Sequence, residues 1–144
     1  MQTLQSIIDT LDLAPHPEGG FYKRMYENDA GPEGRGHATA IYYLLEGQKF
    51  AKWHKVVDAD ELWFWHAGAP LTLEIDAKQK GVQAYTLGID IPAGERPQIT
   101  VRAGEWQRAR CDGDWTLVSC CVSPGFLFEN YDLVEDPDWH PNQA

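Results

Sequence analysis

From residue 21 onward the sequence is a succession of short β-branched and aromatic segments, and this pattern constrains the fold more than any other feature. Turn signals rich in Gly, Pro, Asn or Asp separate the segments. The segments expected as strands are 21–27, 37–45, 49–57, 61–67, 71–76, 82–88, 97–103, 105–110, 115–123 and 126–134. Many short strands with frequent turns and little helix predict an all-β fold, an antiparallel sandwich or barrel.

One helix is expected, and it comes first. Its apolar residues fall on a single helical stripe, at Leu4, Ile7, Ile8 and Leu11. This spacing predicts a helix over residues 2–13, which Pro15 and Pro17 would end. The remaining chain divides into a barrel over 20–134 and a polar, proline-broken tail over 135–144, so a single domain of 1–144 accounts for the sequence.

The charge and cysteine content exclude several classes of protein. Twenty-two acidic residues against 12 Lys and Arg give a net charge of −10, which disfavours nucleic acid and anionic membrane as partners. The three cysteines include no CxxC pair and indicate neither a disulfide framework nor a zinc knuckle. No leader pattern and no apolar run of 18 residues is found, so we expect a cytoplasmic protein.

The stretch 53–68 concentrates the residues that carry chemistry. Strand alternation places His54 and Val56 on one face of their segment, and Glu61, Trp63 and Trp65 on one face of the next. We expect residues 58–60 to turn the chain so that the second segment returns beside the first. If both faces turn inward, an imidazole and a carboxylate meet. They could serve as metal ligands, as a general-base dyad, or as a satisfied structural pair.

This stretch resembles the first cupin motif. Gly47, His54, Glu61 and Gly68 match its Gly, His, Glu and Gly, with one extra residue between the first two. The second cupin motif resembles "RAGEWQ", in which Gln107 stands at the place of a histidine.

A narrower resemblance covers nearly the whole chain. The segments "HPEGGFY", "ATAIYYLL", "DELWFWHAGAPL", "GEWQ" and "SPGFLF" follow in order those of the small cupin family DUF985 (Cupin_5). The resemblance implies a double-stranded β-helix, a cupin jelly-roll barrel with one short N-terminal helix, and a homodimer.

The resemblance also implies a metal-ligand set, and this chain departs from it. His54 and Glu61 match directly, but Val56 replaces a usual histidine and Gln107 replaces another. An alkyl group has no lone pair, and a carboxamide oxygen is a weak ligand for transition metals. The set His54, Glu61 and Gln107 is therefore incomplete. We expect no tightly held cofactor, and a loosely bound divalent transition metal is the alternative.

The favoured hypothesis is a barrel that binds a small polar metabolite, such as a sugar or nucleotide sugar, with metal-independent epimerase or isomerase activity. His54 would be the base, Glu61 would hold it, and Gln107 would donate to a substrate oxygen. The stacking walls would be Trp63, Trp65 and Tyr43. A non-catalytic ligand-binding barrel and a weakly metal-dependent isomerase or dioxygenase stay open, as do the roles of His16, Glu18, Lys23 and His66.

Overall fold

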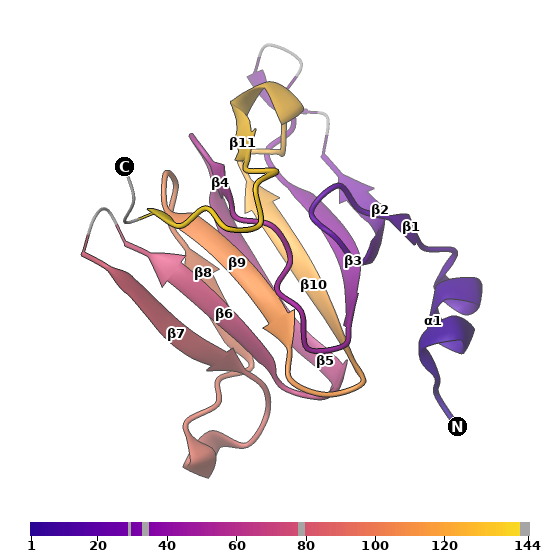
Figure 1. Cartoon of the computed structure of the whole chain (residues 1–144). Helices are drawn as coiled ribbons and strands as arrows, with labels where there is room; N and C mark the ends of the chain where they lie inside the picture. The colour runs from indigo at the N-terminus through magenta and orange to yellow at the C-terminus, as the bar shows by residue number, and fades with distance from the viewer. Residues whose placement is uncertain (29, 33–34, 78–79, 142–144) are drawn as a thin grey trace.

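The computed structural model describes residues 1–28, 30–32, 35–77 and 80–141, and these fold into two antiparallel sheets with a helix outside them (Figure 1). In the described chain the larger sheet has six strands in the order β1-β2-β3-β10-β5-β8. The smaller sheet has five, in the order β11-β4-β9-β6-β7. The all-β jelly-roll architecture expected from the sequence is confirmed.

The elements in chain order are α1 (Leu4–Leu11), β1 (Ala14–Pro15), β2 (Phe21–Glu27), β3 (Thr39–Glu46), β4 (His54–Val56), β5 (Asp60–Gly68), β6 (Leu71–Asp76), β7 (Val82–Leu87), the 3-10 turn η2 (Ile91–Ala93), β8 (Gln98–Val101), β9 (Trp106–Cys111), β10 (Trp115–Ser123), the 3-10 turn η3 (Phe128–Asn130) and β11 (Tyr131–Leu133).

The main hydrophobic core lies between the two sheets. Tyr43, Trp63 and Val118 reach it from the six-stranded sheet, and Leu73 and Ile75 reach it from the five-stranded sheet. Burial alternates along the strands that face it, because successive side chains point to opposite faces. The period-two pattern of the sequence therefore marks the inward positions.

Helix α1 covers the outer face of the six-stranded sheet. Its Ile7 packs with Leu13 and Leu44 in a second, smaller cluster. The helix is shorter than the predicted 2–13. Thr3 caps its start, and Asp12, in the left-handed conformation, ends it before either proline is reached.

The connection after β4 corrects the expected hairpin. Residues 58–60 do not return the chain beside β4, because β4 pairs with β9 and β11 whereas β5 pairs with β10 and β8. The two strands belong to different sheets, so the segment crosses from one layer to the other. Side chains of His54 and Glu61 consequently approach each other across the barrel interior instead of along one sheet.

Two segments form less strand than expected. Of residues 49–57, strand β4 takes three, and Phe50 adds an isolated bridge to Arg110. Residues 126–134 contain η3 before the short β11. Phe128, within η3, is 62 % exposed.

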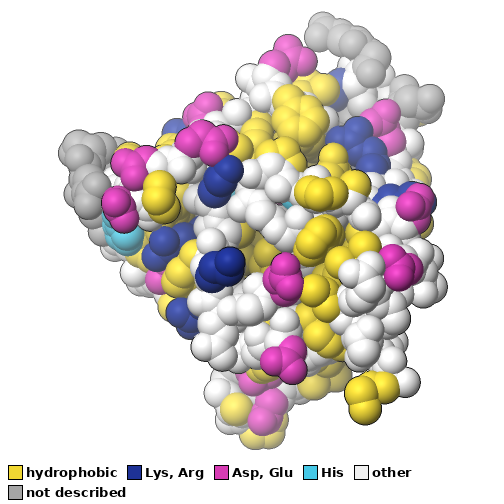
Figure 2. Space-filling model, turned by 45° about the vertical axis from the view of Figure 1, so that its right-hand side comes forward, with side chains coloured by type: hydrophobic (Ala, Val, Ile, Leu, Met, Phe, Trp, Pro, Cys, Tyr) yellow, Lys and Arg dark blue, Asp and Glu magenta, His cyan; other side chains and the backbone are white. Residues whose placement is uncertain are grey.

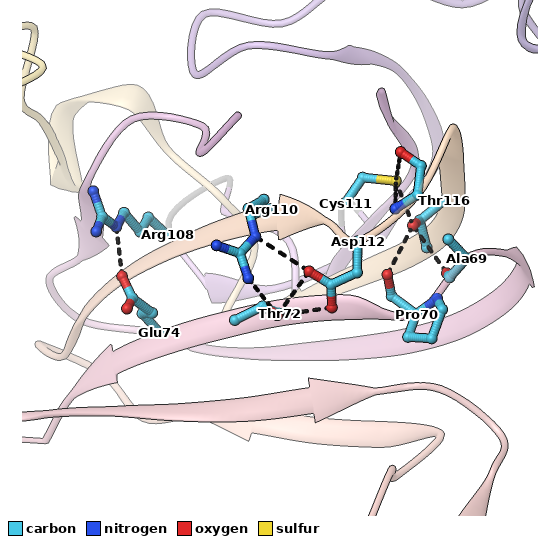
Figure 3. Close-up of polar contacts among 10 residues, drawn as sticks. Ala69, Pro70, Thr72, Glu74, Arg108, Arg110, Cys111, Asp112 and Thr116 are labelled. Atoms are coloured by element: carbon cyan, nitrogen blue, oxygen red, sulfur yellow. Dashed lines mark hydrogen bonds and ion pairs between the residues drawn. The ribbon is translucent and has the colours of Figure 1, made fainter. Parts of the chain in front are cut away.

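The outward face of β6 and β9 carries paired polar side chains (Figure 3). Arg108 contacts Glu74 at 2.6 Å, and Asp112 accepts hydrogen bonds from both Thr72 and Arg110. These contacts lie outside the barrel, so they tie the two strands together without reaching its interior.

The tail after β11 lies against the five-stranded sheet. Trp139 packs on Trp106 with ring centroids 4.7 Å apart, and it meets Trp53 edge-on. Among the described residues no helix is long and apolar enough to cross a membrane.

Candidate functional site

A cavity of about 460 Å³ opens at one end of the barrel, between β2, β3 and β10 on one side and β4 and β11 on the other. Its walls are mainly aromatic and aliphatic, with contributions from Tyr22, Ile41, Val56, Val122 and Phe126. The molecular surface on this side shows hydrophobic side chains gathered around a small area of histidine (Figure 2). The volume suits a small organic molecule.

Three buried ionisable side chains form the floor of the cavity: Glu18, His54 and Glu61. His54 Nε2 lies 3.4 Å from Glu18 Oε2 and 3.9 Å from Glu61 Oε1. The sequence predicted that His54 and Glu61 would meet if both faced inward, and the structure brings them together. Glu18 joins them from the loop before β2.

The His54 ring is fixed in one orientation. Its Nδ1 lies 3.1 Å from the Lys52 carbonyl oxygen, which accepts only, so Nδ1 carries a hydrogen. Nε2 then faces the cavity, and among the described residues it has no hydrogen-bond partner of acceptable geometry. Glu18 and Glu61 attract this atom at ion-pair distance without a well-formed hydrogen bond, so a ligand atom could still bond to it.

Burial by itself lowers the pKa of His54, because it disfavours the charged imidazolium. The attraction of Glu18, the interaction with Glu61 and the hydrogen bond to Lys52 outweigh that effect. Together they raise the pKa to about 9. This raised pKa favours the imidazolium form of His54 at neutral pH.

Glu18 is held by the tight loop 16–20. The Glu18 amide donates to His16 Nδ1 at 3.0 Å, and Gly20 sits at φ +73°. The Tyr131 hydroxyl donates to Glu18 Oε2 at 2.5 Å, and the Tyr43 hydroxyl donates to the Gly19 carbonyl. The sequence left the role of Glu18 open, and the structure places this acid at the cavity.

Gln107 and Trp63 lie behind the floor. Gln107 Nε2 donates to Glu61 Oε1 at 2.7 Å, and Gln107 Oε1 accepts from Trp63 Nε1 at 2.9 Å. The described residues that line the cavity include neither side chain. Both polar ends of Gln107 are thus committed within the protein, and the amide orients Glu61.

The remaining candidates fall in different places. Tyr43 lines the cavity, whereas Trp65 packs beside the core and donates to the Ala69 carbonyl. His66 is exposed and contacts Ser119 at 2.6 Å, on the face opposite Glu61 as alternation predicts. His16 lines the cavity, and its pKa is lowered by burial despite the opposing effect of Glu18.

The rim of the cavity is charged and solvent-exposed. Lys23 lies there, 3.3 Å from Asp12, and Arg24 contacts Glu27 at 2.7 Å. These pairs neutralise each other locally, so the rim adds little net charge. On the inner wall, burial foremost and the charge of Glu61 raise the pKa of the Cys120 thiol, which keeps it protonated.

The donor set does not fit the transition-metal site that the cupin motifs imply. Gln107 Oε1 is engaged by Trp63, and Val56 offers no donor atom where the motif has histidine. Across the described ranges, no group of three or more His, Cys, Asp or Glu side chains is arranged to hold a metal ion. We therefore derive no step through a metal.

Two facing antiparallel sheets that enclose a cavity with the motif residues His54 and Glu61 at its floor define the double-stranded β-helix of the cupins. The chain belongs to the family described as Cupin superfamily (DUF985), whose model matches residues 5–134. The resemblance stated from the motifs is confirmed.

Solved structures agree with this assignment. A crystal structure of a protein from Shewanella oneidensis is 36 % identical, covers 93 % of this chain and 85 % of its own, and superposes with a TM-score of 0.87. A hypothetical protein from Leishmania major is 29 % identical, with 91 % and 86 % covered and a TM-score of 0.82.

More distant structures share the fold alone. An uncharacterised conserved protein with a double-stranded β-helix domain from Klebsiella pneumoniae is 11 % identical, covers 94 % of this chain and 97 % of its own, and has a TM-score of 0.57. A search of curated proteins gave no match.

Proposed function

We propose that this barrel binds a small molecule in the cavity and exchanges a proton with its polar head at the floor. The observation that carries the proposal is the buried Nε2 of His54, which faces the cavity without a hydrogen-bond partner among the described residues. A ligand atom there would satisfy Nε2 and contact the carboxylates of Glu18 and Glu61.

In this proposal His54 acts as the proton donor. The raised pKa, about 9, keeps it charged at neutral pH, so the role of base expected from the sequence passes to a carboxylate. Glu18 and Glu61 are the groups close enough to accept a proton from the ligand.

The apolar walls shift the expected ligand away from a bare sugar. Ile41, Val56 and Val122 offer no hydrogen bonds, and the Tyr43 hydroxyl is used by the Gly19 carbonyl. A ligand with an apolar or aromatic body and one polar head matches this distribution best.

A metal-independent isomerase is the second candidate. An acid and a base stand side by side at the floor, with His54 Nε2 and Glu18 Oε2 3.4 Å apart. His54 would protonate a carbonyl oxygen while a carboxylate removes a proton from the adjacent carbon. Delivery of the proton to the opposite face of that carbon would complete an epimerisation, and delivery to the neighbouring carbon an isomerisation. An enol hydroxyl would return its proton to His54 in either case.

The test is a thermal-shift screen of amines, sugars, nucleotide sugars and keto acids, repeated with His54→Gln. Each stabilising compound is then incubated with the protein in D₂O, and its carbon-bound hydrogens are followed by ¹H NMR. Hydrogen–deuterium exchange at carbon that is lost in His54→Gln supports the isomerase. A compound that binds without this exchange supports a non-catalytic barrel. The binding proposal fails if no compound stabilises the wild-type protein.

A further inference from the structure

The floor of the cavity presents an arrangement of acceptors that the family motifs do not describe. Glu18 comes from the loop before β2, His54 from β4 and Glu61 from β5. His54 is 2 % exposed and the two acids are 8 % exposed each, so water does not solvate these groups as it would on a surface.

The hydrogen-bond donors that the protein supplies to this floor are already engaged with the two acids. Tyr131 donates to Glu18, and Gln107 donates to Glu61. Because the Lys52 carbonyl holds the hydrogen of His54 on Nδ1, loss of the other proton leaves the Nε2 lone pair facing the cavity. The floor then offers three acceptor groups close together, with His54 Nε2 3.4 Å from Glu18 Oε2 and 3.9 Å from Glu61 Oε1.

The charge of the floor is compatible with a cationic head group. Two carboxylates face one imidazole, so if His54 gives up its proton a bound cation has to take its place. The cations of the rim are paired with Asp12 and Glu27 and do not reach it. Uncompensated buried charge is strongly unfavourable.

We propose that the floor binds a primary amine carried on an apolar or aromatic body, with Glu18, His54 and Glu61 each accepting one of its three N–H bonds. This inference rests on the proposed small-molecule binding and names the class of ligand. A hydroxyl group has one hydrogen to donate and would leave acceptors unpaired, whereas an ammonium group has three. The aromatic walls, among them Tyr131 and Phe126, also favour a cation.

Proton balance accompanies binding. A neutral amine entering the free barrel takes the Nε2 proton of His54 and becomes the ammonium. Entry of the ammonium itself releases that proton to solvent, and both routes end with neutral His54 accepting an N–H bond. The groups facing His54 through this exchange are Glu18, Glu61, His16 and Tyr131.

Isothermal titration calorimetry with three matched probes tests the inference. Phenethylamine carries all three N–H bonds, 2-phenylethanol is its neutral analogue, and trimethyl(2-phenylethyl)ammonium keeps the charge without N–H bonds. We expect phenethylamine to bind at least about tenfold more tightly than either analogue, since each analogue loses charged hydrogen bonds to the floor. Equal or tighter binding of either analogue would overturn the inference.

Variants locate the site. Glu18→Gln and Glu61→Gln remove charge with little change of shape and should each weaken phenethylamine binding at least about tenfold. Asp12→Asn at the rim, where the carboxylate side chain is 87 % exposed, should leave it within about twofold. Circular dichroism and thermal unfolding without ligand confirm that the variants fold. Unchanged binding in both floor variants would contradict the assignment.

A competition with Mn²⁺ and Zn²⁺ separates the amine from a metal ion. Binding of either ion that is lost in Glu18→Gln, together with no phenethylamine binding, would assign the floor to a cation of another class and overturn the inference. If phenethylamine fails but another compound of the screen stabilises the protein, the inference falls and the proposed function stands. If nothing binds, both fall.

Discussion

At the scale of single residues, His54 links the stability of the barrel to pH. Burial opposes its charge, but Glu18 and Glu61 outweigh burial and raise the folded-state pKa to about 9 from 6.5. A group whose folded pKa is raised contributes stability that is fully present below the unfolded pKa. That contribution is lost as pH rises through the folded pKa.

We therefore expect the free energy of unfolding to fall between pH 6.5 and 9, by an amount on the order of 3 kcal/mol from this group. Urea unfolding at intervals across this range measures it. His54→Gln should lack this component, and subtracting its curve removes effects of cysteine and tyrosine ionisation. Parallel curves for the two proteins would contradict the raised pKa.

Gln107 is the second single residue for which we predict an effect on stability. It joins Trp63 to Glu61 through two buried hydrogen bonds. In Gln107→Leu both partners lose their contact, and each buried group left unpaired costs about 1–3 kcal/mol. Chemical denaturation should show this loss. Gln98→Leu, at an exposed position of β8, should change stability by no more than about 0.5 kcal/mol.

At the scale of elements, the loop 16–20 determines where Glu18 points. The His16 amide donates to the Gly20 carbonyl and joins the two ends of the loop, and the Lys52 amide donates to the Glu18 carbonyl and holds its middle. A Cβ at Gly20 would lie 2.6 Å from the Leu44 carbonyl oxygen of β3. Close backbone approach therefore requires glycine at this position.

Gly20→Ala should lower the free energy of unfolding by about 1–3 kcal/mol more than Gly47→Ala does. Gly47 has a similar φ of +65° against +73°, but nothing lies within 4 Å of its Cβ. The comparison isolates the steric clash from the backbone strain common to both. Equal losses in the two variants would show that the approach to Leu44 is not tight.

At the scale of the whole molecule, strand β2 leaves an edge open. Among the described strands, β1 covers this edge at Phe21 and Tyr22, while Lys23 to Glu27 have no partner there. Met25 and Tyr26 on this stretch are each 51 % exposed. An open edge of this kind is a template for pairing with another chain.

The homodimer implied by the family resemblance stays a prediction, and this edge is where we expect it. Size-exclusion chromatography with light scattering should give twice the chain mass of 16.3 kDa. Met25→Pro should shift the measured mass toward that of the monomer, because proline has no backbone N–H with which to pair at the outer edge. Met25 has no register partner in β3, so the substitution acts on the outer edge of β2. A wild-type monomer at tens of micromolar would show the prediction to be wrong.

Local pattern was sufficient for much of the fold. Alternation in residues 61–67 separates Glu61 and Trp63 from His66 on opposite faces, and in β5 the first two are buried while His66 is exposed. The same pattern could not show which strands pair. The expected hairpin of 54–66 was wrong because pairing depends on long-range contacts, and β4 and β5 join different sheets.

The sequence by itself determined an all-β chain with one N-terminal helix and its family, because periodicity and motif spacing are local properties. It left the meeting of His54 with Glu61 conditional on both faces turning inward. Only the tertiary structure decided that Glu18 completes the floor and that Gln107 and Trp63 stand behind it. Those positions depend on how a loop and two sheets approach in space. Electrostatics followed from the same packing: burial alone would lower the pKa of His54, but the two carboxylates beside it raise that pKa to about 9.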